Sequence, residues 1–191
     1  MAKHTLVRLL VFTVCIITLG AITARGMTIE PSWDLPPRLV DEPAGFHALR
    51  ARFEKMSIER LEKAGYQVAP VCIEGAMLGQ PELGAMGQHA EHPTLYAQHF
   101  QSGNPNPHHP PVVLVAQGRV VGVEWEFKNV GQERPVLWGQ PVNLGPAHPG
   151  VEEPHYMLHA YFRPDGKILF GDWDPALSCG GSTGTHDGVN H

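Results

Sequence analysis

Two stretches in which apolar and polar residues alternate place the strongest constraint on how this chain can fold. In the first, VVLVA and RVVGVEWEF flank the dipeptide QG, and in the second, HYMLHAYF and KILFGDW flank RPDG. A period of two puts every other side chain on the same face of a strand, and short turns that contain glycine join neighbouring antiparallel strands. The sequence therefore predicts two β-hairpins, over residues 112–127 and 155–173.

One strand of each hairpin has an apolar face and a polar face. In the strand that ends at residue 127, the apolar face comprises Val121, Val123, Trp125 and Phe127, and the other face comprises Gly122, Glu124 and Glu126. In the strand at 155–162, the more apolar face comprises Tyr156, Leu158, Ala160 and Phe162, and the other comprises His155, Met157, His159 and Tyr161. A sheet with one apolar face buries that face against another layer.

The segment 46–65 predicts the helix that supplies this layer. Its apolar residues recur at roughly helical spacing, and Gly65 follows as a C-cap: they are Leu49, Phe53, Met56, Leu61 and Ala64. The glycine-rich segment 74–89 is interpreted as a loop, and PTLYAQHF at 93–100 as a further strand. The predicted fold is α+β, with one amphipathic helix packed on a curved antiparallel sheet and with long loops rich in proline and glycine.

The N-terminus has the pattern of a secretory signal peptide. Lys3 and Arg8 are followed by an apolar run at residues 9–24, which is shorter than the roughly 20 residues of a membrane-spanning helix. We predict a secreted or periplasmic protein, with an uncleaved anchor as the alternative. The predicted organisation is a signal peptide at 1–24, an extended N-terminal segment at 25–44, a single α+β domain at 45–179 and a disordered tail at 180–191.

The net charge limits the classes of binding partner, and the cysteine content indicates the cellular compartment. The formal net charge is −5 at pH 7, and lysine and arginine form no run, which argues against nucleic acid and against strong binding to a membrane surface. Beyond the apolar N-terminal run, the chain has two cysteines, Cys72 and Cys179. Export to an oxidising compartment favours a disulfide between them, with two unpaired thiols as the alternative.

The spacing of His155 and His159 allows two kinds of chemistry, depending on the local structure. On a helix, residues four apart share a face and can bind one metal ion. On a strand they also share a face, but they stand about 13 Å apart at about 3.3 Å per residue. The aromatic-rich sequence favours a strand. At most one of the two histidines is then expected to join a given metal, unless a bulge or bend brings them together.

A further histidine, His89, follows the glycines of GAMGQH and is expected to be presented from a rigid loop. If the apolar faces of both hairpin strands pack on the helix, Glu124 and the two histidines of the second hairpin emerge on the same side of the sheet. The loop with His89 would fold over that side. The candidate metal ligands are therefore His89, Glu124, His155 and His159.

Six short motifs, in order along the chain, resemble those of an uncharacterised family of exported bacterial proteins. They are AGYQVAPVC at 64–72, GAMGQH at 84–89, VVGVEWEF at 120–127, GQP at 139–141, HYMLHAYF at 155–162 and DPALSC at 174–179. The resemblance covers roughly residues 48–179. It implies that the shared polar residues are important and that the two cysteines pair: His89, Glu124, His155, His159, Cys72 and Cys179. It implies no particular reaction.

Three functions remain open at the level of sequence, and no cofactor or enzymatic activity is assigned. The first is an exported protein with a pocket for a divalent transition metal or a small ligand, because imidazole and carboxylate together suit such metals. The second is a metal-free enzyme in which a histidine and Glu124 act as acid and base. The third is a non-catalytic envelope protein whose histidines form a structural polar network.

Overall fold

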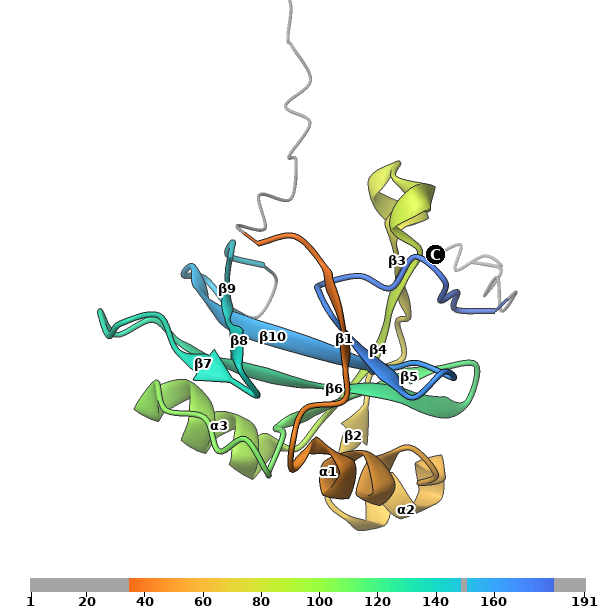
Figure 1. The fold of residues 1–191 in the computed structure, drawn as a ribbon, viewed down its shortest axis with the longest axis horizontal. Helices are drawn as coiled ribbons and strands as arrows, with labels where there is room; N and C mark the ends of the chain where they lie inside the picture. The colour runs from red at the N-terminus through yellow and green to blue at the C-terminus, as the bar shows by residue number, and fades with distance from the viewer. Residues whose placement is uncertain (1–34, 149–150, 181–191) are drawn as a thin grey trace, which may run out of the picture. The chain divides into compact units, whose positions relative to one another are not determined.

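The computed structural model describes residues 35–148 and 151–180. The predicted signal peptide at 1–24 lies outside the described residues, and so do 25–34 of the predicted extended segment and 181–191 of the predicted tail. The described residues form an α+β structure that contains a large antiparallel sheet (Figure 1). The fold class predicted from the sequence is therefore confirmed, although the number of helices differs.

The described helices are α1 (Phe46–Phe53), α2 (Ile58–Lys63) and α3 (Pro93–Ser102), with short 3-10 helices η1 (Gly75–Leu78) and η2 (Pro81–Leu83). The described strands are β1 (Arg38–Asp41), β2 (Gln67–Val68), β3 (Ile73–Glu74), β4 (Ala85–Glu91), β5 (Val112–Ala116), β6 (Arg119–Lys128), β7 (Val136–Leu137), β8 (Gln140–Pro141), β9 (Asn143–Gly145), β10 (His155–Phe162) and β11 (Lys167–Phe170).

The main sheet has its two longest strands at the centre. Its strand order is β1-β11-β10-β6-β5-β4-β2, while β3 pairs with β4 and β9 pairs with β10. The pairs in this sheet are all antiparallel, and β7 and β8 form a separate two-stranded sheet. Strand β1 comes from the predicted extended segment and lies at one edge of the sheet. Strands β6 and β10 are therefore each hydrogen-bonded to a neighbouring strand along both edges.

Both predicted hairpins are confirmed, as β5–β6 and β10–β11. Gln117 and Gly118 join the first pair with φ angles of 51° and 73°, and two positive φ angles are typical of the turns that fit the twist of a hairpin. A register shift near Leu114 changes one detail of the predicted faces. Val121 belongs to the small apolar cluster on the polar side of the sheet rather than to the side of Val123.

The prediction of one continuous helix over 46–65 is wrong. The chain forms α1, leaves the helical path at Glu54 and starts α2 after Ser57. The Ser57 hydroxyl accepts a hydrogen bond from the backbone N–H of Arg60, which is the usual way in which serine begins a helix. Serine as an N-cap therefore divides an apolar pattern that continues across both helices.

The prediction of a strand at 93–100 is also wrong, because these residues belong to α3. Pro93 occupies the first turn, where the missing N–H is not needed. The His92 side chain accepts a hydrogen bond from the N–H of Leu95, and Gly103 ends the helix in a left-handed conformation. These start and stop signals outweigh the aromatic and β-branched residues that suggested a strand.

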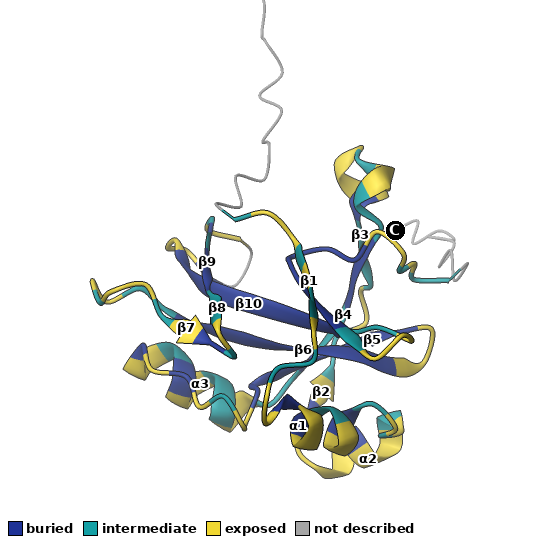
Figure 2. Cartoon of the chain, in the orientation of Figure 1, coloured by how far each residue is buried: buried dark blue, intermediate teal, exposed yellow. Residues whose placement is uncertain are grey.

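The two faces of the sheet are covered differently. Phe46, Leu49, Phe53 and Leu61 of α1 and α2 pack against one face in a single core that includes Trp125, Phe127 and Leu158, as predicted for the apolar side. On the other face, Tyr96 and Phe100 of α3 contact residues of β6 and β10. Figure 2 shows β6 and β10 buried along most of their length. Polar side chains on these strands are therefore buried as well.

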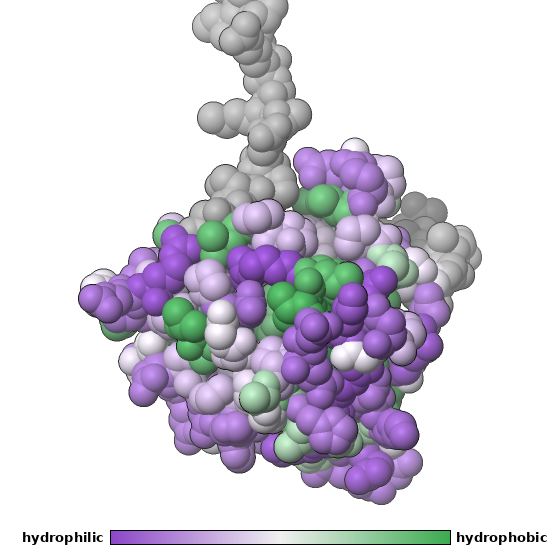
Figure 3. All heavy atoms as spheres, viewed as in Figure 1, coloured by the Kyte–Doolittle hydropathy of each residue, from purple (hydrophilic) through white to green (hydrophobic). Residues whose placement is uncertain are grey.

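Large hydrophobic side chains that remain exposed are scattered over the described surface. They belong to β1, η1, β7 and loops: Leu39, Val71, Met77, Leu78, Val130 and Val136. On the face drawn in Figure 3, hydrophobic residues form small groups among hydrophilic ones. The described apolar side chains are thus mainly inside, around the sheet.

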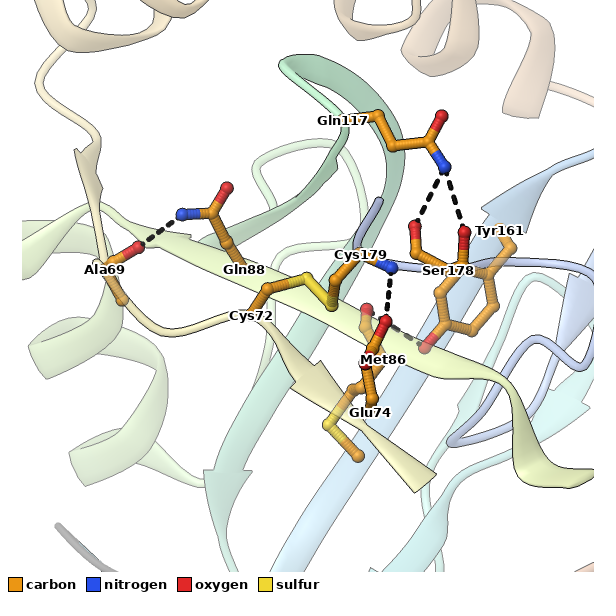
Figure 4. Close-up of a disulfide and its surroundings, with 9 residues drawn as sticks. All are labelled: Ala69, Cys72, Glu74, Met86, Gln88, Gln117, Tyr161, Ser178 and Cys179. Carbon is orange, nitrogen blue, oxygen red and sulfur yellow. Dashed lines mark hydrogen bonds between the residues drawn. A yellow bond between two sulfur atoms is a disulfide. The ribbon is translucent and has the colours of Figure 1, made fainter. Parts of the chain in front are cut away.

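The predicted disulfide is present between Cys72 and Cys179, which are 107 residues apart in sequence (Figure 4). Cys72 precedes β3, and Cys179 lies after the last strand. The backbone N–H of Cys179 donates a hydrogen bond to Glu74, and Gln117 donates to Ser178. The disulfide and these hydrogen bonds attach the C-terminal segment to the β3–β4 side of the sheet.

Candidate metal centre

Carboxylates and imidazoles gather on the sheet face opposite α1 and α2. The register pairs His159 with Glu124, and Met157 with Glu126. Glu124 and Glu126 are two residues apart on β6, and His155 and His159 are four apart on β10, so all four side chains lie on one face. The predicted common face for Glu124, His155 and His159 is therefore present.

Three of the predicted ligands come together in a group that we call the first triad: His89 on β4, Glu124 on β6 and His159 on β10. His89 Nε2 lies 3.1 Å from Glu124 Oε2, and His159 Nε2 lies 3.3 Å from Glu124 Oε1. One ligand atom from each residue falls within 4.8 Å of the others. The three side chains thus converge on one point.

His89 reaches this point from a strand, not from a glycine loop as the sequence predicted. The segment 74–89 folds into η1, η2 and the first part of β4, and His89 pairs with Leu114 of β5. Gly87 has a φ of 101°, and a side chain there would meet the Val115 carbonyl oxygen at 2.9 Å. Glycine at position 87 therefore lets β4 approach β5 closely, and the pairing of these strands positions His89.

The first triad is mostly buried, and several of its polar atoms lack hydrogen-bond partners. Glu124 and His159 are 2% and 1% exposed, while the His89 side chain is 25% exposed. Glu124 Oε2 and both ring nitrogens of His159 make no hydrogen bond within the described part of the chain. The short distances to Glu124 are thus close approaches without hydrogen-bond directionality. Buried polar atoms without partners are costly, so this group requires compensation.

A second carboxylate stands behind His159. Asp172 Oδ1 lies 3.5 Å from His159 Nδ1, and both Asp172 oxygens accept hydrogen bonds from the Asn143 side chain, at 3.0 and 2.8 Å. Histidines that bind metals usually have such a carboxylate or carbonyl on the far side of the ring. Asp172 is thus placed to orient His159 so that Nε2 points at Glu124.

Electrostatics keep Glu124 charged in spite of its burial. Burial alone would raise the pKa of Glu124, but His159 and His89 lower it below the usual range. Burial likewise opposes the charged form of His159, yet Glu124 and Asp172 raise its pKa. The buried carboxylate of the first triad therefore attracts positive charge, which is carried either by a proton on an imidazole or by a metal ion.

The fourth predicted ligand, His155, does not join the first triad. It lies in a separate group with Glu126 and His148, which we call the second triad. Burial would raise the pKa of Glu126, but the nearby imidazoles of His148 and His155 lower it below the usual range. The strand geometry that separates residues four apart accounts for this division between the two histidines.

Sequence reasoning missed several residues that surround these groups. Glu126 was recognised only as a neighbour of Glu124 on the polar face, although the alternating pattern already placed the two side by side. Tyr96, Asn143, His148 and Asp172 carry no local signal, because each is brought to the site by the fold from α3, β9 or a loop. Tyr96 was hidden further by the wrong strand prediction.

Comparison with known proteins adds no relative, since no family model, no curated protein and no solved structure matches this chain. Among the described helices, none is long and apolar enough to cross a membrane. The functional conclusion therefore rests on the geometry of the site.

Proposed function

We propose that this protein binds a divalent transition metal through His89, Glu124 and His159. The observation that carries the proposal is the convergence of three buried or half-buried ligand atoms that lack hydrogen bonds to one another. A buried carboxylate and imidazole without directed hydrogen bonds are expensive in an apolar interior. Coordination to a metal ion satisfies Glu124 and the Nε2 atom of His159 together.

The spacing of the ligand atoms supports a small tetrahedral ion. Zinc bonds of about 2.0–2.1 Å in tetrahedral geometry separate neighbouring ligand atoms by about 3.3 Å. The observed separations are 3.1 Å from His89 Nε2 to Glu124 Oε2 and 3.3 Å from His159 Nε2 to the other oxygen, Oε1, and one ligand atom from each of the three residues lies within 4.8 Å of the others. An ion of this size therefore requires side-chain movements that bring the three ligand atoms from within 4.8 Å to about 3.3 Å of one another.

The chemistry of the donor set favours zinc, copper, nickel or iron over calcium or magnesium. Two imidazoles and one carboxylate are typical ligands of transition metals, whereas calcium and magnesium take oxygen ligands almost entirely. Three protein ligands leave one coordination position for water or a small ligand. Such a ligand would approach from the side of the site where His89 is partly exposed to solvent.

We further propose that the metal is bound outside the cytoplasm. The Cys72–Cys179 disulfide supports this, because disulfides persist mainly in oxidising compartments. The signal-peptide pattern of residues 1–24 and the resemblance to exported bacterial proteins point the same way. Membership of that family stays part of the proposal.

The proposal predicts that His89→Ala weakens metal binding while the fold is kept. His89 contributes a direct ligand from a half-buried place in β4. Removing a residue that only hydrogen-bonds a metal ligand lowers metal affinity by up to about 100-fold. Truncation of His89 is therefore expected to lower zinc affinity at this site by at least about 100-fold. Isothermal titration calorimetry of protein without a polyhistidine tag measures this, with copper and nickel as further titrants.

The matched control is His109→Ala, in the exposed loop after α3, which should bind metal as the unmodified protein does. If His89→Ala also binds zinc, copper and nickel as tightly as the unmodified protein, the proposal is wrong. The His–Glu group would then be a structural polar network, in which a proton on His159 balances Glu124.

A further inference from the structure

A backbone carbonyl selects the tautomer of neutral His155. His155 is fully buried, and its Nδ1 atom lies 2.9 Å from the carbonyl oxygen of Glu153. A carbonyl oxygen only accepts hydrogen bonds, so Nδ1 must carry the proton. In the neutral ring the other nitrogen, Nε2, is then unprotonated and presents a lone pair.

This lone pair faces the Glu126 carboxylate and the His148 imidazole at short range. His155 Nε2 lies 2.9 Å from Glu126 Oε1 and shares a 3.2 Å hydrogen bond with His148 Nε2, whose donor depends on the tautomers of the two rings. The same Glu126 oxygen accepts a hydrogen bond from the Tyr96 hydroxyl at 2.8 Å. A buried nitrogen lone pair directed at a carboxylate is unfavourable unless a cation lies between them.

We propose that Glu126, His148 and His155 form a second site for a divalent transition metal, with zinc as the reference ion. The three ligand atoms are separated by 2.9, 3.2 and 3.4 Å, close to the separation of about 3.3 Å around a tetrahedral zinc ion. A proton on the Nε2 atom of His148 or of His155 satisfies these approaches only in part, whereas a metal ion between the three atoms satisfies all of them.

Surrounding groups fit the role of outer partners. The Glu153 carbonyl fixes the ring orientation of His155, as carbonyls and carboxylates do for the histidines of metal sites. Tyr96, from α3, fixes the Glu126 oxygen that points at both imidazoles. The His148 side chain is 38% exposed, so an ion can enter from solvent at this residue.

The second site goes beyond the proposed function and does not depend on the first triad. Glu124 and Glu126 are two residues apart on β6, which corresponds to about 6.6 Å along a strand. Two metal ions that share ligands lie about 3.5–4 Å apart. The two triads are therefore expected to bind one ion each, without a shared ligand.

Zinc stoichiometry in four proteins tests this inference: the unmodified chain, His89→Ala, His148→Ala and the double variant. Each is dialysed against buffered zinc, and the bound metal is measured by mass spectrometry. We expect two equivalents, one, one and none, respectively. His148 is a loop residue with a half-exposed side chain, so its truncation should leave the circular dichroism spectrum unchanged, with His109→Ala as the control.

The outcomes separate the two sites. If His148→Ala keeps as much zinc as the unmodified protein while His89→Ala loses one equivalent, the second site is rejected and the first triad stands. His148, His155 and Glu126 would then form a polar network without a metal ion. If His148→Ala loses one equivalent and His89→Ala loses none, the second site stands and the proposed function is rejected.

Discussion

Replacing Glu124 by glutamine is expected to remove the stabilisation that zinc gives to the first triad. A ligand that binds only the folded state stabilises it by about 2.7 kcal/mol at 100 times its dissociation constant. Glutamine keeps the size of the side chain but supplies no negative charge to the metal. The melting temperature of Glu124→Gln should therefore no longer rise when zinc is added. Calorimetry in a His148→Ala background isolates the first triad.

Glu91→Gln is the matched control. Glu91 is a half-buried carboxylate two residues after His89 on β4, and burial together with Glu126 and Glu124 raises its pKa. It lies outside both triads, so its replacement should preserve the response to zinc. An equal loss of the response in Glu91→Gln and Glu124→Gln would mean that general negative charge, not coordination by Glu124, attracts the ion.

Loss of the disulfide is expected to lower the free energy of unfolding by about 2–5 kcal/mol. The bond joins residues that are 107 apart in sequence, so it restricts the unfolded chain strongly. In the folded protein, the hydrogen bond from Cys179 to Glu74 remains when Cys72 and Cys179 are both replaced by serine. Denaturation in urea, compared with the oxidised protein, measures the difference.

Zinc affinity should change little in this double serine variant at temperatures where it is folded, because His89, Glu124 and His159 are positioned by β4, β6 and β10. A difference in unfolding free energy below about 1 kcal/mol would contradict the expected contribution of the disulfide. A large loss of zinc affinity in the folded variant would show that the cysteines support the site directly.

Local patterns in the sequence predicted the central sheet correctly. The alternation in RVVGVEWEF and HYMLHAYF depends only on neighbouring residues, and hairpin turns pair such segments directly. The strand geometry also indicated that at most one of His155 and His159 would join a given metal unless a bulge or bend brought them together, although the candidate ligand set included both, and the two histidines lie in different triads. Val121 was misplaced because a register shift in a strand leaves no trace in the alternation itself.

Errors arose where capping residues compete with an apolar pattern. Ser57 divides a helical stripe into α1 and α2, and Pro93 with Gly103 encloses a helix in a segment rich in aromatic residues. The glycines before His89 suggested a loop, although Gly87 permits close approach within β4. Both triads also depend on contacts distant in sequence. His148 and Asp172 could be found only once β9, β10 and the segment after β11 were placed around His155 and His159.

Anomalous diffraction from a crystal grown with zinc tests the central claim most directly, with data collected above the zinc absorption edge. The account predicts a peak bonded to His89 Nε2, His159 Nε2 and a Glu124 oxygen, at about 2.0–2.2 Å from each. The contradicting result is a fully zinc-exposed crystal with no anomalous peak among these three residues, whose side chains then bond only to one another and to water.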